Sequence, residues 1–216
     1  MNYLEAMDII GGLSQPSKMP WFGWSISAKE CDTGSKLRKV PGSVCSKCYA
    51  CKGNYMFPAV TNAHARRLAA LDDERFVDAF ILVLTQLFER SRLGYERNGT
   101  WVKENRFRWH DSGDLQSLEH LEAINKIALA TPMLDHWLPS KEHGVVNTFL
   151  KKHGSFAPNL VVRMSAVMMG ETFMKRPMGL PFSTVNVTTE LNQCPAKQQE
   201  GKCKDCRNCW DADKDV

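Results

Sequence analysis

The sequence predicts an α/β fold, either a partial βα barrel or a parallel sheet, with a cysteine-rich extension at the C-terminal end. Three observations support this class. Short apolar segments near residues 107, 135, 161 and 184 recur at intervals of roughly 25 residues. Helical patterns fill the first two intervals, and apolar periodicity stops near residue 190. Alternating strands and helices are typical of βα units, whose strands pair in parallel.

The first half of the chain contains one expected strand and one expected helix. Residues 21–27 read as the first strand, which places the long loop from Cys31 to Cys51 at its carboxyl end. Apolar side chains then recur at spacings of three and four between Phe76 and Phe88, with Asp72 before them and Gly94 after them. That spacing predicts an amphipathic helix.

The rest of the chain reads as four further strands with helices between them. A turn at 98–99 precedes the alternating strand 106–110, which runs into the polar loop 111–114. Ser117 is expected to cap the next helix, whose apolar stripe covers 118–128. The remaining expected elements are a strand at 134–138, a helix capped by Ser140 and terminated by Gly154, and strands at 160–164 and 184–187.

Composition limits the classes of protein that fit. The chain has 216 residues, of which 43% are hydrophobic and 24% charged, and this balance favours a folded domain over general disorder. We expect an α/β domain over 1–190 and an extension over 191–216 packed on it. The net charge of +4 is small for a protein whose main task is to neutralise phosphates, so nucleic acid stays open as a partner without being required. No apolar run reaches a membrane-spanning length and the first residues lack a signal-like core, so we expect a cytoplasmic protein without a membrane partner.

The eight cysteines carry the strongest chemical signal. They fall into two groups of four separated by more than half the chain, and each group contains a C-x2-C-x2-C run. In a reducing compartment such clusters usually bind metal rather than form disulfides. Zinc sites usually combine two separated C-x2-C pairs, whereas a 4Fe–4S cluster can take each of three closely spaced thiolates on a different iron. We therefore expect iron–sulfur ligation, with zinc as the alternative, by Cys31, Cys45, Cys48, Cys51, Cys194, Cys203, Cys206 and Cys209.

The number of clusters stays open at this point. Cys31 and Cys194 can each complete a four-cysteine site, which gives two closed clusters. If Cys31 is not a ligand, one iron of the first cluster is open to a substrate or cofactor. Cysteines from both ends of the chain can also surround a single cluster.

Polar residues at expected strand ends form the second candidate site. Ligands of parallel α/β sheets bind at the carboxyl ends of the strands, where the first cysteine loop and the 110–114 loop both fall. His110, Asp111 and Asp114 are the candidate catalytic residues, because a histidine titrates near neutrality and carboxylates can orient its proton. The same residue types also suit a capped turn. Lys141 and Arg163 are further candidates: Lys141 as an anion ligand or a solvated lysine, and Arg163 because a buried guanidinium needs an anionic partner such as Asp111 or a ligand carboxylate.

Three separated motifs resemble the phage gene-product-88 domain family. They are the segment from Cys48 to Gly53 (CYACKG), the segment from Arg108 to Asp114 (RWHDSGD), and the segment that starts Cys194-Pro195-Ala196 and ends Cys209-Trp210. They occur in the same order and span nearly the whole chain. The resemblance implies a virus-encoded protein that works in a host cytosol.

A weaker likeness links the chain to the AdoMet radical enzymes. That family builds a partial βα barrel with three cysteines in the loop after the first strand, and the segment from Cys48 to Cys51 looks like the second half of its motif. Cys45 and Cys48 are separated by two residues where the family has three, and no Gly-Gly-Glu motif follows the second strand. By this analogy the loop with Asp111, Ser112, Gly113 and Asp114 would bind the amino group of S-adenosylmethionine.

These observations lead to one functional hypothesis and two rivals. The leading hypothesis is an iron–sulfur protein, an oxidoreductase or AdoMet-radical-like enzyme, that performs redox or radical chemistry on a small ligand at the strand ends. The first rival is a zinc-stapled module that binds nucleic acid or a host protein. The second rival keeps the clusters without an enzymatic role, either as an electron carrier whose partner is another electron-transfer protein or as a structural cluster.

Overall fold

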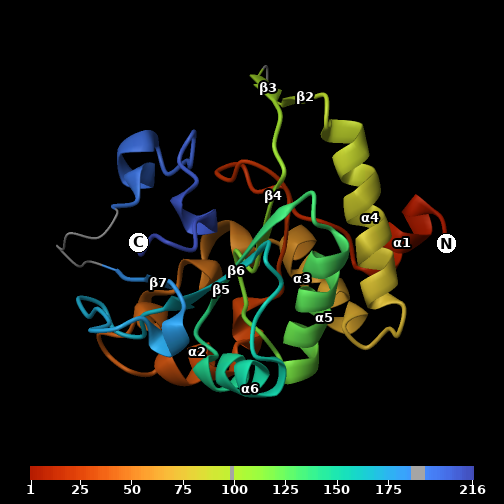
Figure 1. The fold of residues 1–216 in the computed structure, drawn as a ribbon. Helices are drawn as coiled ribbons and strands as arrows, with labels where there is room; N and C mark the ends of the chain where they lie inside the picture. The colour runs from red at the N-terminus through yellow and green to blue at the C-terminus, as the bar shows by residue number, and fades with distance from the viewer. Residues whose placement is uncertain (98–99, 186–192) are drawn as a thin grey trace.

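The computed structural model of the chain describes residues 1–97, 100–185 and 193–216. Its main sheet has five strands in the order β1-β4-β5-β6-β7, and every neighbouring pair is parallel. The sheet is open and does not close into a barrel (Figure 1). The predicted α/β class with a parallel sheet is therefore confirmed. The strands are β1 (Gly23–Trp24), β4 (Arg106–Trp109), β5 (Asp135–Ser140), β6 (Leu160–Ser165) and β7 (Phe182–Ser183).

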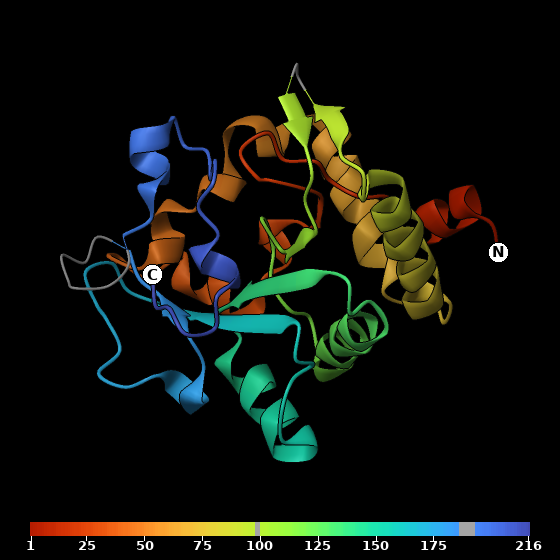
Figure 2. The ribbon, with the colours of Figure 1, turned by 45° about the horizontal axis from the view of Figure 1, so that its top comes forward.

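Helices cover one face of this sheet. The crossovers from β4 to β5 and from β5 to β6 run through α5 and α6, and right-handed crossovers between strands in sequential order place their helices on the same face. Helix α5 packs against both α4 and α6, and α1 packs against α4. Figure 2 shows α5 and α6 on one side of the sheet and the C-terminal segment on the other. The α-helices are α1 (Tyr3–Ile9), α2 (Asp32–Leu37), α3 (Pro58–Ala70), α4 (Phe76–Ser91), α5 (Leu118–Ala130) and α6 (His143–His153).

Aromatic side chains fill the core between the sheet and the helices. The rings of Phe80 on α4 and Trp109 on β4 lie 4.8 Å apart between centroids, and Phe107 lies 5.0 Å from Trp109. Trp24 at the end of β1 meets Trp109 edge-on at 6.2 Å. All four rings are buried, so burial of apolar area joins the first strand to the centre of the sheet.

Several elements follow the sequence closely. Helix α4 begins at Phe76, and the Ser117 hydroxyl accepts a hydrogen bond from the His120 amide at 3.2 Å to cap α5. Gly154 ends α6 at a φ of 81°, and its amide donates to the Leu150 carbonyl at 2.8 Å. These ends form as predicted because their signals are local.

Other elements differ from the expectation. The first strand covers two residues, Gly23–Trp24, instead of 21–27. Ser140 closes β5 instead of capping α6, whose first flanking residue is Glu142. The last strand pairs at 182–183, ahead of the expected 184–187, and residues 186–187 lie outside the described residues, as does the expected turn at 98–99. Beside that turn, the short strands β2 (Tyr95–Arg97) and β3 (Thr100–Val102) form an antiparallel pair.

Residues 193–216 pack on the face of the sheet that the helices leave free. The short 3-10 helix η7 (Asn208–Trp210) contacts β5 and β6, while η6 (Pro195–Gln199) lies earlier in the segment. The Trp210 indole donates to the Phe107 carbonyl at 3.1 Å and lies 5.0 Å from the Trp137 ring. The Val216 amide donates to the Phe182 carbonyl, so the segment returns to the edge strand β7. No helix in the described part of the chain is long and apolar enough to cross a membrane.

Candidate functional site

The first cysteine set, Cys31, Cys45, Cys48 and Cys51, lies in a loop of short 3-10 turns between β1 and α3. Cys31 immediately precedes α2. Cys45 lies in η2 (Val44–Lys47), Cys51 ends η3 (Tyr49–Cys51), and Cys48 is the residue between these two turns. The Cys48 amide donates to the Cys45 carbonyl at 3.1 Å, and the Cys51 amide donates to the Cys48 carbonyl at 3.4 Å. Each turn advances the chain by three residues, which is the spacing of the motif.

Backbone and side-chain hydrogen bonds fix this loop at the carboxyl ends of the strands. The Val44 amide donates to the Val167 carbonyl at 2.9 Å, just beyond β6. Glu142, which follows β5, accepts the Thr33 amide at 2.9 Å and the Thr33 hydroxyl at 2.6 Å. The predicted meeting of the first cysteine loop with the strand ends is thereby seen in the structure.

Cys31 and Cys45 meet across a glycine. An ideal Cβ built on Gly34 would lie 3.5 Å from the Cys31 sulfur, 3.7 Å from the Cys45 sulfur and only 2.8 Å from the Cys31 Cβ. Gly34 is buried inside α2, where glycine is a weak helix former. We infer that the glycine is needed because any larger side chain would enter the space between the two sulfurs.

Burial favours the protonated form of the Cys31, Cys45 and Cys51 thiols while no cation is bound. Burial raises the pKa of Cys31 to about 12, and the charges of Asp114 and Cys45 add to this effect. Burial also raises the pKa of Cys45. The charge of Lys141 acts in the opposite direction, because it favours the thiolate. The pKa of Cys51 is raised by burial and by Cys48. A bound metal would reverse this balance, because it deprotonates a coordinating thiol outright.

Asp111 connects the strand ends to the cysteine loop. Its carboxylate accepts hydrogen bonds from the Ser25 hydroxyl beyond β1 and from the Tyr55 hydroxyl at 2.8 Å. Its backbone carbonyl accepts the hydroxyl of Tyr49, the residue that follows Cys48. Asp111 is thus committed to holding the loop, and both of its carboxylate oxygens have internal partners.

Asp114 is buried beneath the same loop. One carboxylate oxygen accepts the Ser140 hydroxyl at 2.6 Å and the Leu115 amide at 2.8 Å, and the other accepts the Lys141 amide at 2.8 Å. Burial raises its pKa to about 6, although these hydrogen bonds act in the opposite direction. The preceding Gly113 has a φ of 79°, and a Cβ there would lie 2.4 Å from the Ile26 side chain, so it serves backbone geometry.

His110 lies behind the strand ends instead of facing an open pocket. It is 3% exposed, its backbone φ is 53°, and its ring lies 5.2 Å from that of His120. Neither ring nitrogen of His110, nor the Ser112 hydroxyl, has a hydrogen-bond partner within the described part of the protein. Burial lowers the pKa of His110 well below its usual value, and His120 and Arg108 add to this. The ring is therefore neutral at pH 7.

The two predicted cationic ligands have different surroundings. The Lys141 amide binds Asp114 and its charge acts on Cys45, so it belongs to the first cysteine loop. Arg163 is fully buried but faces backbone carbonyls instead of the expected anion. Its guanidinium donates to the carbonyls of Phe182, Asn208, Cys209, Asp211 and Lys214. Asp111 is not its partner; Arg163 anchors the C-terminal segment.

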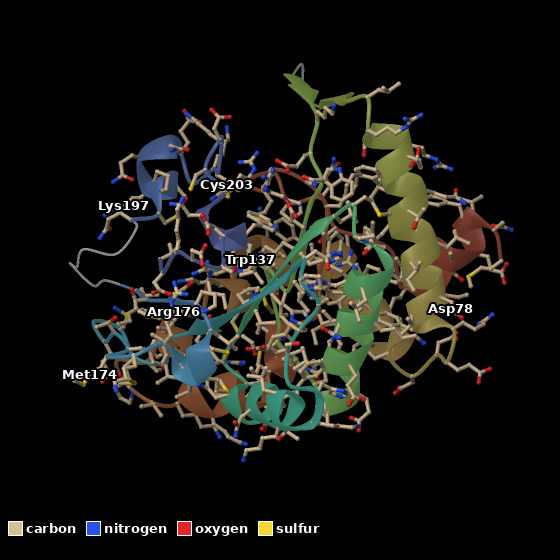
Figure 3. All side chains as sticks on the ribbon, viewed as in Figure 1. Asp78, Trp137, Met174, Arg176, Lys197 and Cys203 are labelled. Atoms are coloured by element: carbon tan, nitrogen blue, oxygen red, sulfur yellow. The ribbon has the colours of Figure 1, made fainter. Side chains whose placement is uncertain are left out.

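The second cysteine set, Cys194, Cys203, Cys206 and Cys209, lies in that segment. The Cys206 amide donates to the Cys203 carbonyl at 2.9 Å, and Cys203 and Cys209 pack against Met19, Trp137 and Trp210. Figure 3 shows Cys203 on the C-terminal segment near Trp137 of β5. Cys194 is exposed, and its charge acts on both Cys203 and Cys209.

Arginines surround this second set. Burial raises the pKa of Cys209 to about 11, while Arg163 and Arg108 favour its thiolate. The Arg108 guanidinium carbon lies 4.4 Å from the centroid of the Trp137 ring, and its charge also lowers the pKa of Cys203. Arg108 in addition favours the ionised form of Tyr49, so its charge reaches both cysteine sets.

Neither set forms a preorganised site for a single ion. Among the residues that the structure describes, no three His, Cys, Asp or Glu side chains are arranged so that they could hold one metal ion. The structure places four cysteines in the loop between β1 and α3 and the other four in the C-terminal segment.

The order of these features along the chain matches a known family model over residues 14–212, described as Gene product 88. The chain belongs to the Gene product 88 family. The match contains both cysteine sets and the polar loop between them. Comparisons with curated proteins and with solved structures give no match.

Sequence reasoning missed two functional candidates of this family member. Tyr55 and His64 stand beside the first cysteine set, with ring centroids 6.2 Å apart and nearly parallel at 24°. Both line a cleft of about 190 Å³ between the cysteine loop and α3. Neither residue belongs to a motif, so their pairing becomes visible only when α3 folds back onto the loop.

Proposed function

We propose that this protein is a virus-encoded iron–sulfur protein that performs redox or radical chemistry on a small ligand near the carboxyl ends of its sheet. One observation supports this most directly: the eight cysteines gather into two separate sets of four, one at the strand ends and one on the free face of the sheet. Cysteine thiolates at this spacing in the sequence are typical ligands of 4Fe–4S clusters.

The first set fits a metal cluster in its donor chemistry and in the space at Gly34. All four donors are sulfur, and a Cβ on Gly34 would occupy the region between the Cys31 and Cys45 sulfurs. A bound cluster would supply one-electron transfer at this position. The proposed ligands are Cys31, Cys45, Cys48 and Cys51, and the second set would hold a further cluster in the C-terminal segment.

Residues around the first set favour the thiolate form in which its cysteines would bind a metal. The charges of Lys141 and Arg38 partly offset the burial that raises the pKa of Cys45, while Glu142 and Tyr55 hold the loop in place through Thr33 and Asp111. The neutral ring of His110 adds no charge beneath the site. Fixed positive charges next to buried cysteines favour the deprotonated thiolate, which is the form that binds metal.

S-adenosylmethionine has less support than the cluster. The carboxylates expected to hold its amino group, on Asp111 and Asp114, already accept hydrogen bonds from Ser25, Tyr55 and Ser140 and from backbone amides. No step is therefore derived through this cofactor. Cys31 sits within the cysteine loop close to Cys45, which is the position of a fourth ligand, so we propose a closed first cluster.

Metal analysis of protein purified without oxygen tests the proposal. We expect about four iron and four sulfide per cluster, with Mössbauer and EPR signals of cubane clusters. Cys48→Ala should remove the first cluster and Cys206→Ala the second, so that each halves the iron content, whereas the control Ser46→Ala should not. Loss of all iron in either cysteine variant indicates one shared cluster. Zinc alone, at one ion per four cysteines, contradicts the proposal and supports a zinc-stapled binding module.

A glycine substitution tests the fit of the first set directly. Gly34→Ala should lower the iron content of the first set, because the new methyl group enters the space between two sulfurs. Gly144→Ala is the matched control, since Gly144 also lies in a helix but a Cβ there would meet nothing within 4 Å. Equal iron in both variants would show that the space at Gly34 does not hold the metal. If loaded wild-type protein passes electrons but cleaves no S-adenosylmethionine, an electron carrier is the better description.

A further inference from the structure

The cleft beside the first cysteine set has the lining of a site for a flat ring. Tyr55 and His64 present stacked rings, Ala50 and Leu68 add apolar surface, and Lys29 is at its rim. Its volume of about 190 Å³ is below the roughly 300–1,000 Å³ of pockets that take drug-sized ligands. A single heterocycle fits this size better than a large ligand does.

The loop that contributes one wall of the cleft is strongly positive. Residues 29–52 contain six basic side chains and two acidic ones, Glu30 and Asp32, so this loop alone has a formal charge of +4. The whole chain has the same formal charge of +4, so the remaining residues sum to zero. Lys29, Lys47 and Lys52 are exposed. A positive charge concentrated in one loop attracts a polyanion more strongly than the modest total charge suggests.

Exposed aromatic and apolar side chains stand among these lysines. Tyr49 is 56% exposed, Phe57 59% and Met56 43%, and all three flank the turns that lead into the cleft. The hydroxyl of Tyr49 donates to the Asp111 carbonyl, which holds its ring in place. Fixed, exposed rings beside positive charges are the features by which proteins hold unstacked bases and the phosphates between them.

We propose that this surface binds single-stranded nucleic acid and that the cleft receives one unstacked base. Lys47 and Lys52 would contact phosphates, Phe57 and Tyr49 would stack on bases next to the cleft, and Lys29 and Glu30 would face the edge of the inserted base. A base in a duplex is stacked and paired, so it would first have to be extruded. The inference names the substrate class of the proposed cluster site and to that extent rests on the proposed function, but binding itself requires no metal.

The test is a fluorescence anisotropy titration with labelled 12-nucleotide RNA, the same sequence as single-stranded DNA, and the corresponding DNA duplex. Iron is measured in the same full-length preparations. We expect both single strands to bind more tightly than the duplex, with an affinity that falls as salt rises. Lys47→Glu/Lys52→Glu should weaken binding by roughly tenfold or more, because it replaces attraction to phosphates by repulsion. Phe57→Ala should weaken it by roughly fivefold or more through lost stacking.

A double variant with the same change in charge provides the control. Lys126→Glu/Lys151→Glu alters exposed residues near the C-terminal ends of α5 and α6, which run back toward the amino ends of the strands. This control should bind like the wild type at moderate salt. Absence of binding to either single strand, or equal weakening by the two charge variants, overturns the inference. Specific binding by iron-free protein would support the inference while contradicting the proposed cluster, and an iron-loaded protein that binds no oligonucleotide would do the reverse.

Discussion

The two cysteine sets have similar spacing in the sequence but are held by different means. The first set is part of a loop whose side chains hydrogen-bond to two strand ends, at Asp111 after β4 and at Glu142 after β5. The second set lies in a segment with one large buried aromatic, Trp210, and its backbone carbonyls converge on Arg163. The first is positioned by carboxylates that accept hydrogen bonds from the loop, and the second chiefly by the Arg163 guanidinium, which donates to carbonyls of its segment.

This difference separates the expected roles of the two sets. The first lies beside a cleft and exposed aromatic residues, where a ligand can approach. The second covers the free face of the sheet and packs against Trp137, so it fills the space that an open sheet would otherwise expose. We therefore expect changes at the second set to affect stability first and changes at the first set to affect the site first.

The largest expected effect is that of Arg163→Met. This change removes the guanidinium that donates to the partly buried carbonyls of Cys209 and Lys214 and to the buried carbonyl of Phe182, and an unsatisfied buried group costs about 1–3 kcal/mol. We expect the free energy of unfolding to fall by roughly 4 kcal/mol, and proteolysis to remove the C-terminal segment, as measured by urea denaturation and mass spectrometry.

Arg176→Met is the matched control for this prediction. Arg176 also donates to carbonyls of the C-terminal segment, at Ala212 and Asp213, but its side chain is 32% exposed, so water can replace the lost bonds. Its effect should be less than half as large. If both variants lose the same stability, the C-terminal segment is not held chiefly by Arg163.

A smaller effect is expected at the first set from Thr33→Val. The Thr33 hydroxyl donates to the buried carboxylate of Glu142 at 2.6 Å, and a hydrogen bond to a charged group contributes about 1.5–3 kcal/mol. We expect a loss of roughly 1.5 kcal/mol together with faster iron release from the first set only, followed by EPR during chelation. Thr148→Val removes a comparable bond from the exposed surface of α6 and should change neither quantity. Faster release from both sets would show that the two are coupled.

The smallest expected effect is a dependence on pH. Burial lowers the pKa of His136 to about 3, and its ring stays neutral between the Trp109 indole and the Thr131 hydroxyl. The unfolded ring takes up its proton near pH 6.5, so the stability present above that pH is lost as the pH falls from 6.5 toward 3. Between pH 7 and 5.5 this amounts to about 1 kcal/mol for one buried histidine.

His136→Gln tests this prediction by the slope of stability against pH. The variant should lose about 1 kcal/mol less than the wild type between pH 7 and 5.5, because one titrating group has been removed. Contributions from cysteines and from other histidines are common to both proteins and cancel in the comparison. Identical slopes would show that His136 is already accessible to protons in the folded state.

Much of the fold could be predicted because its signals are local. The stripe from Phe76 to Phe88, the Ser117 cap and the Gly154 terminator depend on residues within a few positions of one another. The lengths of β1 and β7 could not be predicted, because a short edge strand ends where the neighbouring strand no longer offers hydrogen-bond partners. The prediction that Ser140 caps a helix was wrong because of a contact between residues distant in the sequence. Its hydroxyl bonds to Asp114, which follows the end of a different strand.

The site was predicted less completely than the fold. The first cysteine set and the loop with Asp111 and Asp114 were identified as residues of interest, and the structure brings them together at the strand ends. Their partners could not be read from the sequence. Arg163 was expected to face an anion and instead binds carbonyls, because the five N–H donors of a buried guanidinium can be satisfied by backbone that arrives from a distant segment.

The sequence by itself determined the α/β class, the amphipathic helices and the presence of eight cysteines in two spaced groups, because periodicity, capping and motif spacing are properties of short segments. Only the tertiary structure decided that the sheet stays open, that the C-terminal segment covers its free face, and that Tyr55 and His64 form a cleft beside the first set. These features depend on contacts between segments far apart in the chain, which form where burial and hydrogen bonding are satisfied together.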